Sequence, residues 1–115
     1  MNKKEKRPWG NFKIIHQEPG ITIKIISVKA NQRLSLQSHK ERDEMWLLLT
    51  GQAIYQLDEI QQPLIKGISE VIPRHFKHRL IAGRKGCRVL EISFGKFDEN
   101  DIVRYEDDYG RTKLN

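Results

Sequence analysis

The sequence has little of what would mark a secreted, disulfide-bonded or membrane-spanning protein. It has a single cysteine, Cys87, so no disulfide can staple the fold, as is usual in a reducing compartment. No apolar run approaches the roughly 18 residues that a membrane span needs. The basic N-terminus MNKKEKRPWG is followed by no apolar stretch, which excludes a cleaved secretory signal. We therefore expect a cytoplasmic protein with no membrane partner.

Length and charge narrow the class further. The 115 residues suffice for one compact domain but not for a catalytic domain plus a regulatory one, so we predict one domain over residues 1–115. The net charge of +6 allows an anionic partner. No nucleic-acid-binding module is recognisable, and residues 98–108 are acidic. We expect no nucleic-acid partner, whereas a phosphorylated metabolite stays open.

Short runs rich in branched apolar and aromatic residues recur along the chain, separated by turn-forming residues such as Pro19 and Gly20. These runs are residues 12–16, 21–28, 33–37, 45–49, 52–57, 63–66, 70–72 and 88–94. Many short strands at close spacing predict an all-β sandwich or barrel. Only residues 98–109 have a helical pattern, with Asn100 as a plausible cap, and there we expect a turn or two at most.

Several of these runs alternate with period two, which is typical of strands with one buried face. Ile21, Ile23 and Ile25 occupy one set of alternate positions in the second run. Thr22, Lys24 and Ile26 occupy the other set. The pattern predicts one dry face and one wet face for this strand.

Two segments collect side chains that can bind a metal ion. His39, Glu41 and Glu44 fall within six residues, and His75 and His78 lie three apart after a proline. Residues two apart on a strand share a face, so His39 and Glu41 would point the same way, and Glu44 can join them if a bend intervenes. A solvated charged turn would contain the same residues. The first segment alone therefore leaves both interpretations open.

Taken together, the two segments resemble the two cupin motifs. The first motif has two histidines one residue apart, then a glutamate, then six residues and a glycine; His39, Glu44 and Gly51 fit it. The second motif has a glycine, five residues and a proline, then a glycine and a histidine at fixed intervals. Its matching positions here are Gly67, Pro73 and His78. The resemblance implies a cupin fold, a small double-stranded β-helix or jelly-roll barrel with a polar pocket.

The resemblance narrows to the type II mannose-6-phosphate isomerases, which include the C-terminal domain of bifunctional mannose-1-phosphate guanylyltransferase/mannose-6-phosphate isomerases. It is carried by RPWG at 7–10, RLSLQSH at 33–39, RDEMW at 42–46, IPRHFKHRL at 72–80 and DIVRYEDDYGR at 101–111. It covers nearly the whole chain, and we expect the isolated isomerase module. It also implies a homodimer.

Three positions depart from the family pattern. Glu41 stands where the second histidine of the first motif is usual, His75 stands at the glycine of the second motif, and Met45 replaces another histidine. A carboxylate in place of an imidazole keeps a donor atom but makes the site harder and less suited to zinc. His75 can in principle restore the lost nitrogen ligand.

A divalent metal is therefore expected, with zinc, manganese, iron, cobalt and nickel as candidates. The predicted ligands are His39, Glu41, Glu44 and His78, with His75 as an alternative. The metal would polarise the substrate oxygens; without it, Arg79 would have to supply the positive charge. The base that moves the proton would be Glu44, Glu41 or His75.

The predicted substrate is a phosphorylated hexose. Glu44 and Arg79 are the predicted catalytic residues, and Lys77, Arg104 and Arg111 are predicted to bind substrate, because a guanidinium pairs well with phosphate. The function implied first is isomerisation of mannose-6-phosphate to fructose-6-phosphate. The alternatives are a non-catalytic cupin that binds a sugar phosphate or related anion, and a sugar-nucleotide isomerase or epimerase.

Overall fold

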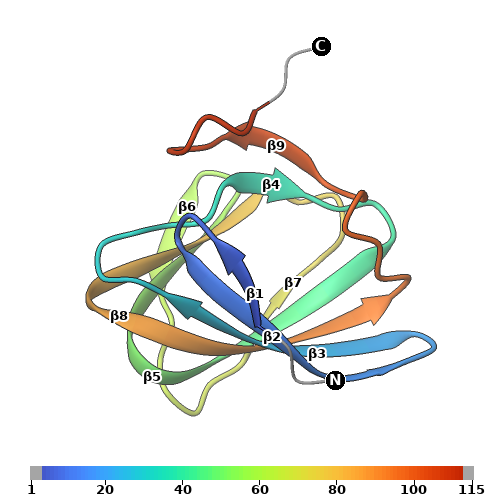
Figure 1. Ribbon diagram of the computed structural model, residues 1–115, viewed down its shortest axis with the longest axis horizontal. Helices are drawn as coiled ribbons and strands as arrows, with labels where there is room; N and C mark the ends of the chain where they lie inside the picture. Colours follow the sequence, from blue (N-terminus) through green and yellow to red (C-terminus); the bar gives the residue numbers. More distant parts are fainter. Residues whose placement is uncertain (1–3, 113–115) are drawn as a thin grey trace.

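A nine-stranded antiparallel sheet that curls back on itself forms the protein, as the computed structural model shows (Figure 1). The structure describes residues 4–112. Its strands are β1 Lys4–Arg7, β2 Gly10–Glu18, β3 Ile21–Val28, β4 Leu36–Ser38, β5 Arg42–Leu57, β6 Ile60–Pro63, β7 Glu70–Ile72, β8 His78–Gly95 and β9 Val103–Glu106. Within residues 4–112 there is no helix, hence none long and apolar enough to cross a membrane.

Strands β5 and β8 are the backbone of this sheet, with 16 and 18 residues that pair along nearly their whole length. Both turn a corner where the register of β5 shifts around Gly51. Gly51 has φ +86°, and a Cβ there would lie 2.2 Å from the carbonyl oxygen of Gly86. The approach of the two backbones thus requires glycine, and it lets the sheet close around an interior.

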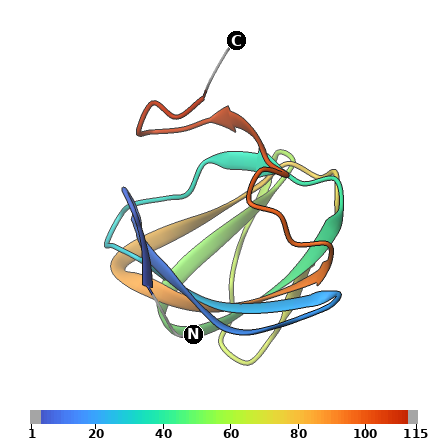
Figure 2. The ribbon, with the colours of Figure 1, turned by 45° about the vertical axis from the view of Figure 1, so that its right-hand side comes forward.

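The remaining strands extend the sheet from these two. On one side the order is β8, β3, β2 and β1, while β6 and β7 pair with β5. β4 pairs with the start of β8, and β9 pairs with β4. β4 and β9 lie at one end of the curled sheet, and the chain that follows β8 runs up to them (Figures 1 and 2).

The interior is filled by alternate residues of the strands. On β8 the fully buried Leu80 and Val89 point inward, and on β5 Trp46 does so with 1% exposure. The same inward set includes Glu44 and Glu91, both buried. One end of the interior is therefore apolar core and the other end is lined by ionisable side chains.

On strand β3, polar side chains face the interior and most of the isoleucines face outward, the opposite of what an apolar interior would predict. Thr22 and Lys24 are buried, at 2% and 8% exposure, on the same face as the buried Ile26, whereas Ile21, Ile23 and Ile25 are only half-buried on the outer face. The alternation was visible in the sequence, but hydrophobicity alone could not say which set faces the interior, because the interior here is polar.

Most of the expected strand runs are confirmed in type but differ in extent; the run at 63–66 is wrong, because only Pro63 belongs to a strand, β6, and of the run at 33–37 only residues 36 and 37 lie in β4. Residues 45–49 and 52–57 belong to one strand, β5, and the run at 88–94 starts ten residues earlier as part of β8. The short C-terminal helical turn does not occur in the described residues. Residues 103–106 form β9 instead, because the free edge of β4 offers backbone hydrogen bonds, and the Tyr105 hydroxyl shares a 2.8 Å hydrogen bond with that of Ser38.

Candidate functional site

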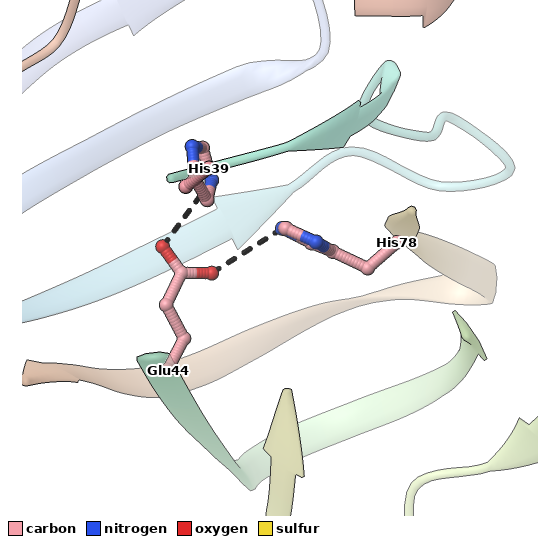
Figure 3. Close-up of side chains that lie close together, drawn as sticks. All are labelled: His39, Glu44 and His78. Atoms are coloured by element: carbon pink, nitrogen blue, oxygen red, sulfur yellow. Dashed lines mark ion pairs between the residues drawn. The ribbon is translucent and has the colours of Figure 1, made fainter. Parts of the chain in front are cut away.

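His39, Glu44 and His78 converge inside the curled sheet, and we call them the metal cluster (Figure 3). His39 directly follows β4, Glu44 is on β5 and His78 begins β8. Their side chains are 2–4% exposed. His39 Nε2 is 3.5 Å from Glu44 Oε2, and His78 Nε2 is 3.4 Å from Glu44 Oε1. Three potential metal-ligand atoms from three strand regions thus meet in one buried place.

Backbone carbonyls fix how the two imidazoles are turned. His39 Nδ1 donates to the carbonyl of Asp101 at 2.7 Å, and His78 Nδ1 donates to the carbonyl of Phe76 at 3.1 Å, since a carbonyl oxygen can only accept. Both Nε2 atoms are therefore directed at Glu44. Metal-binding histidines are commonly oriented by such a hydrogen bond from the other ring nitrogen.

Glu44 supplies a further sign that a cation fits here. Its Oε1 atom is buried and has no hydrogen-bond partner in the part of the chain that the structure describes. A buried carboxylate oxygen without a donor is costly unless a cation or proton is present. Burial alone would raise the pKa of Glu44, but His78, His39 and Arg42 outweigh it and lower that pKa. The cluster therefore fits a divalent cation held by two imidazoles and one carboxylate.

The two histidines respond differently to the same surroundings. Burial lowers the pKa of His39 to about 4, with the charges of Arg42 and His78 acting in the same direction. Burial also opposes the charged form of His78, but the Glu44 carboxylate, 3.4 Å from His78 Nε2, outweighs this and raises the pKa of His78. His39 is thus a neutral donor of a lone pair at neutral pH, as metal ligation requires.

Arg42 was not among the predicted site residues, yet its side chain contacts the cluster. Its Nε donates to Glu44 Oε2 at 3.0 Å and its Nη2 donates to His39 Nε2 at 3.2 Å. A metal ion on His39 Nε2 would replace the second bond, while Nη1 would keep its bond to the Asp98 carbonyl. Period two along β5 could have found this residue, because Arg42, Glu44 and Trp46 share the inward face.

The structure does not bring Glu41 or His75 to the cluster. Both side chains are exposed. The chain bends between the end of β4 and the start of β5, so Arg42 rather than Glu41 is the residue that points inward beside Glu44. His75 lies in the turn before β8 with φ +74°, where its backbone N–H donates to the His39 carbonyl at 2.7 Å. Its position explains why a glycine is usual there.

The metal cluster lies at the bottom of a pocket that opens to solvent. Glu91, Lys24 and Trp46 also line it, and with the metal cluster they form what we call the floor. Trp46 Nε1 donates to Glu91 Oε2 at 2.8 Å. Sequence analysis missed Glu91, although the alternation of β8 places it on the same face as Val89.

Four charged residues surround the mouth, and we call them the rim: Arg7, Glu99, Arg104 and Arg111. Arg104 Nε is buried and has no hydrogen-bond partner among residues 4–112. Burial, and then the positive charges of Arg111 and Arg7, lower the pKa of Arg104. Arg111 and Arg7, which pair with Asp107 and Glu99, therefore still lie close enough to repel the Arg104 guanidinium, and a bound anion would relieve that repulsion.

Arg79, predicted as catalytic, and the predicted substrate residues have separate places. Arg79 lines the pocket wall, but its Nε donates to the Leu34 carbonyl and its Nη1 to the Glu106 carboxylate, so it ties β8 to β9. Lys77 is exposed outside the pocket, with its ammonium 4.5 Å from the centre of the Tyr105 ring. Arg104 and Arg111 are the predicted substrate residues that reach the mouth.

Comparison with known proteins agrees with this geometry. The family model described as "Mannose-6-phosphate isomerase C-terminal" matches residues 1–107. The chain is 37% identical over 113 residues to the xanthan biosynthesis protein XanB of Xanthomonas campestris pv. campestris, covering 96% of this chain and 24% of XanB. It is 37% identical to the alginate biosynthesis protein AlgA of Pseudomonas aeruginosa, covering 92% of this chain and 22% of AlgA. The chain spans about a quarter of the length of these relatives.

Solved structures share the fold at low sequence identity. KdgF from Halomonas sp. matches with TM-score 0.78 and 17% identity, covering 85% of this chain and 92% of that one. Pac13, a nucleoside dehydratase, matches with TM-score 0.79 and 11% identity, covering 91% and 84%. The capsular polysaccharide assembling protein CapF from Staphylococcus aureus matches with TM-score 0.77 and 16% identity, covering 90% and 32%. The predicted all-β cupin class of fold is confirmed.

Proposed function

The chain belongs to the family of mannose-6-phosphate isomerase C-terminal domains, and from this premise we propose that it converts mannose-6-phosphate to fructose-6-phosphate. The observation that carries the proposal is the metal cluster at the bottom of a pocket with three arginines at its mouth. An aldose–ketose isomerase needs a grip on the phosphate and a place where negative charge on two neighbouring oxygens is stabilised. The pocket offers both.

We assign the phosphate to the rim. Arg104 presents an unpartnered buried nitrogen, and Arg111 and Arg7 add charge beside it. Arginine suits a phosphate because its planar fork donates parallel charge-assisted hydrogen bonds. Binding the phosphate at the mouth leaves the first carbons of the sugar directed toward the metal cluster. Arg79, with its nitrogens engaged by β9 and Leu34, holds the pocket wall in place.

We propose that His39, Glu44 and His78 hold the divalent metal, with manganese, iron, cobalt, nickel and zinc as candidate ions. When bound, such an ion polarises the carbonyl and hydroxyl oxygens of the substrate and stabilises charge that develops on them. Glu44 anchors the site and Arg42 keeps its carboxylate oriented through the 3.0 Å hydrogen bond.

The test is a coupled assay of the purified protein with mannose-6-phosphate, after chelation and after addition of each candidate metal. Turnover that disappears on chelation and returns with metal is the expected result. Saturable binding of mannose-6-phosphate without turnover under any metal would overturn the enzyme proposal and favour a non-catalytic sugar-phosphate binder. Turnover confined to sugar nucleotides would overturn the substrate and favour a sugar-nucleotide isomerase or epimerase.

We further propose that the protein is a homodimer that associates through the outer face of strands β2, β3, β8 and β5. Apolar side chains form two cross-strand rows on this face: Ile23 with Ile92 and Met45, and Ile25 with Leu90 and Leu47. Lys13 and Arg88 flank the rows at one end, and Glu18 and Asp43 at the other. A two-fold axis through the middle would place the basic end of one copy against the acidic end of its partner.

Light scattering at micromolar concentration tests the dimer. The expected mass is twice 13.6 kDa, and Leu90→Glu should reduce it to the monomer because a carboxylate would be placed in the apolar rows. Ile60→Glu is the matched control, since Ile60 is 64% exposed on β6, away from that face. A wild-type protein that runs as a 13.6 kDa species would refute the dimer.

A further inference from the structure

The isomerisation needs a carboxylate or imidazole to carry a proton. The candidates expected from the sequence, Glu41, Glu44 and His75, are not placed to do this. Glu41 and His75 are exposed away from the metal cluster. Glu44 has its two oxygens directed at His39, Arg42 and His78. Two other carboxylates line the pocket in the described part of the chain, and Glu99 is half-exposed at the rim, where it pairs with Arg7. Glu91 is the one that is buried.

Glu91 is held in a way that leaves one oxygen free. It points inward from β8 with 4% exposure, and its Oε2 accepts the 2.8 Å hydrogen bond of the Trp46 indole. Its Oε1 is buried without a hydrogen-bond partner among residues 4–112. The Trp46 ring meets the His78 ring edge to face at 5.7 Å between centroids. Glu91 is thus one side chain away from the metal cluster, with one oxygen hydrogen-bonded to Trp46 and the other buried without a hydrogen bond among the described residues.

Lys24 completes the surroundings of that open oxygen. Its ammonium lies 3.7 Å from Glu91 Oε1, and the rings of Phe12 and Phe97 flank it at 4.2 and 4.5 Å. Burial, and then the negative charge of Glu44, raise the pKa of Glu91, while Lys24 opposes the rise. A carboxylate with a raised pKa is a stronger base than an exposed one and gives the proton back more readily than an amine would.

We propose that Glu91 is the catalytic residue that moves the proton between the two carbons of the hexose phosphate, with Lys24 as its positioning residue. The inference rests on the proposed isomerase function. It differs from that proposal because it assigns the proton transfer to a residue outside the metal cluster.

The step balances without any further reactant. In the open-chain aldose, Glu91 Oε1 takes the proton from C2; the C2–H electron pair becomes the C1–C2 double bond, and the carbonyl pair of C1 moves onto O1. The proton of the C2 hydroxyl then passes to O1, the electron pair on O2 forms the new C2 carbonyl, and Glu91 returns its proton to C1. One C–H bond and one O–H bond are broken, and one of each is formed.

Glu91→Gln is the variant that tests this. The amide keeps the shape and can still accept the Trp46 hydrogen bond, but it cannot take a proton. We expect kcat to fall by about 10²–10⁴-fold, with KM and bound metal close to wild type. The incorporation of deuterium from D₂O into C1 of the product should be lost in parallel. Glu59→Gln, an exposed turn residue, is the matched control and should behave as wild type in every measurement.

The outcomes separate the two proposals. If the wild type does not turn over mannose-6-phosphate with any metal, the proposed function is wrong and this inference with it. Suppose instead that the wild type is active. If the Glu91→Gln variant is folded and metal-loaded and its kcat stays within about tenfold of wild type, this inference alone is overturned. Should Glu91→Gln not fold, Glu91→Asp retains the charge opposite Lys24 but withdraws the oxygen; a kcat equal to wild type in that variant would also overturn the assignment.

Discussion

The floor and the rim of the pocket are built from different parts of the chain and in different ways. The floor comes from β3, β5, β8 and the end of β4, and its metal cluster is 2–4% exposed. The rim comes from β1 and from the segment after β8, with Arg7 and Arg111 exposed by 27% and 23%. The floor is fixed by long, fully paired strands, whereas the rim depends on short strands and ion pairs. The proposed chemistry thus belongs to the part built on long strands, and the proposed substrate capture to the part built on short ones.

The two regions also differ in how their charges are balanced. In the floor, each ionisable group is buried and faces another one, so the removal of one partner leaves an uncompensated buried charge. At the rim, Arg7 pairs with Glu99 at 3.0 Å with both side chains partly exposed, while Arg111 pairs at 2.8 Å with Asp107, whose side chain is buried. A partly exposed pair such as Arg7–Glu99 contributes little to stability and can exchange partners when an anion arrives. Changes in the floor should thus have all-or-none effects, and changes at the rim graded ones.

The largest effect is expected from His78→Ala in the floor. The variant loses one of two imidazoles of the metal cluster, so elemental analysis of protein purified without chelator should show loss of stoichiometric metal. Isomerase activity should fall by at least about 100-fold, since a bound metal is worth several kcal/mol of transition-state stabilisation. Circular dichroism should show a folded sheet, because the apolar core is untouched.

His75→Ala is the control for that variant. It removes an imidazole three residues away that is exposed and outside the cluster, so bound metal and activity should stay at the wild-type level. Loss of metal in His75→Ala would mean that His75 is a ligand after all. Retention of stoichiometric metal in His78→Ala would contradict the metal cluster itself.

The second largest effect is expected at the rim from Arg104→Gln. Removing the guanidinium with the unpartnered buried nitrogen should raise KM for mannose-6-phosphate by about 10–100-fold, as expected for one lost charge-assisted contact. Bound metal should not change, because Arg104 does not contact the cluster. Arg84→Gln removes the same charge from an exposed position of β8 and should leave KM at the wild-type value. An equal KM in both variants would place the phosphate elsewhere.

Much of the floor could be predicted from sequence, because its residues are spaced by strand geometry. His39, Glu44 and His78 follow the intervals of the two cupin motifs, and the structure brings them together. Glu41 does not join the cluster, because residues two apart share a face only within one strand, and the chain bends between β4 and β5. The same reasoning would have identified Glu91 if the inward face of β8 had been known to be polar.

The rim could be predicted only in part. Arg104 and Arg111 were expected from the terminal signature, but Arg7 joins them through the pairing of β1 with β2, which no local pattern indicates. Strand β9 was expected as a helical turn because its pairing with β4 is a contact distant in sequence. Secondary-structure propensity describes a segment in isolation, whereas the available edge of β4 decides that this segment forms a strand.

Asp101 is where the rim segment reaches the floor, and Asp101→Ala should have an intermediate effect. Its carbonyl accepts the His39 Nδ1 hydrogen bond, and its carboxylate accepts the backbone N–H groups of Lys40 and Glu41, each at 2.9 Å. Without the carboxylate the carbonyl is held less firmly, so metal affinity should fall by about tenfold, measured by competition with a chelating dye. Asp108→Ala, which removes an exposed carboxylate paired with Arg33, should not change it. Equal affinities would show that the floor does not depend on the rim.

The smallest effect is expected from Tyr105→Phe, which removes only the hydroxyl that links β9 to Ser38 of β4. Loss of one partly buried hydrogen bond should lower the free energy of unfolding by about 1 kcal/mol, measured by urea denaturation. KM should rise by no more than a few-fold, because the backbone pairing of β9 with β4 remains and keeps Arg104 at the mouth. A double-mutant cycle with Ser38→Ala isolates the contact: if the hydroxyl pair holds β9, the second substitution should cost almost nothing once the first is made. Strictly additive losses would mean that β9 is held by its backbone pairing alone, and that the rim is as firmly built as the floor.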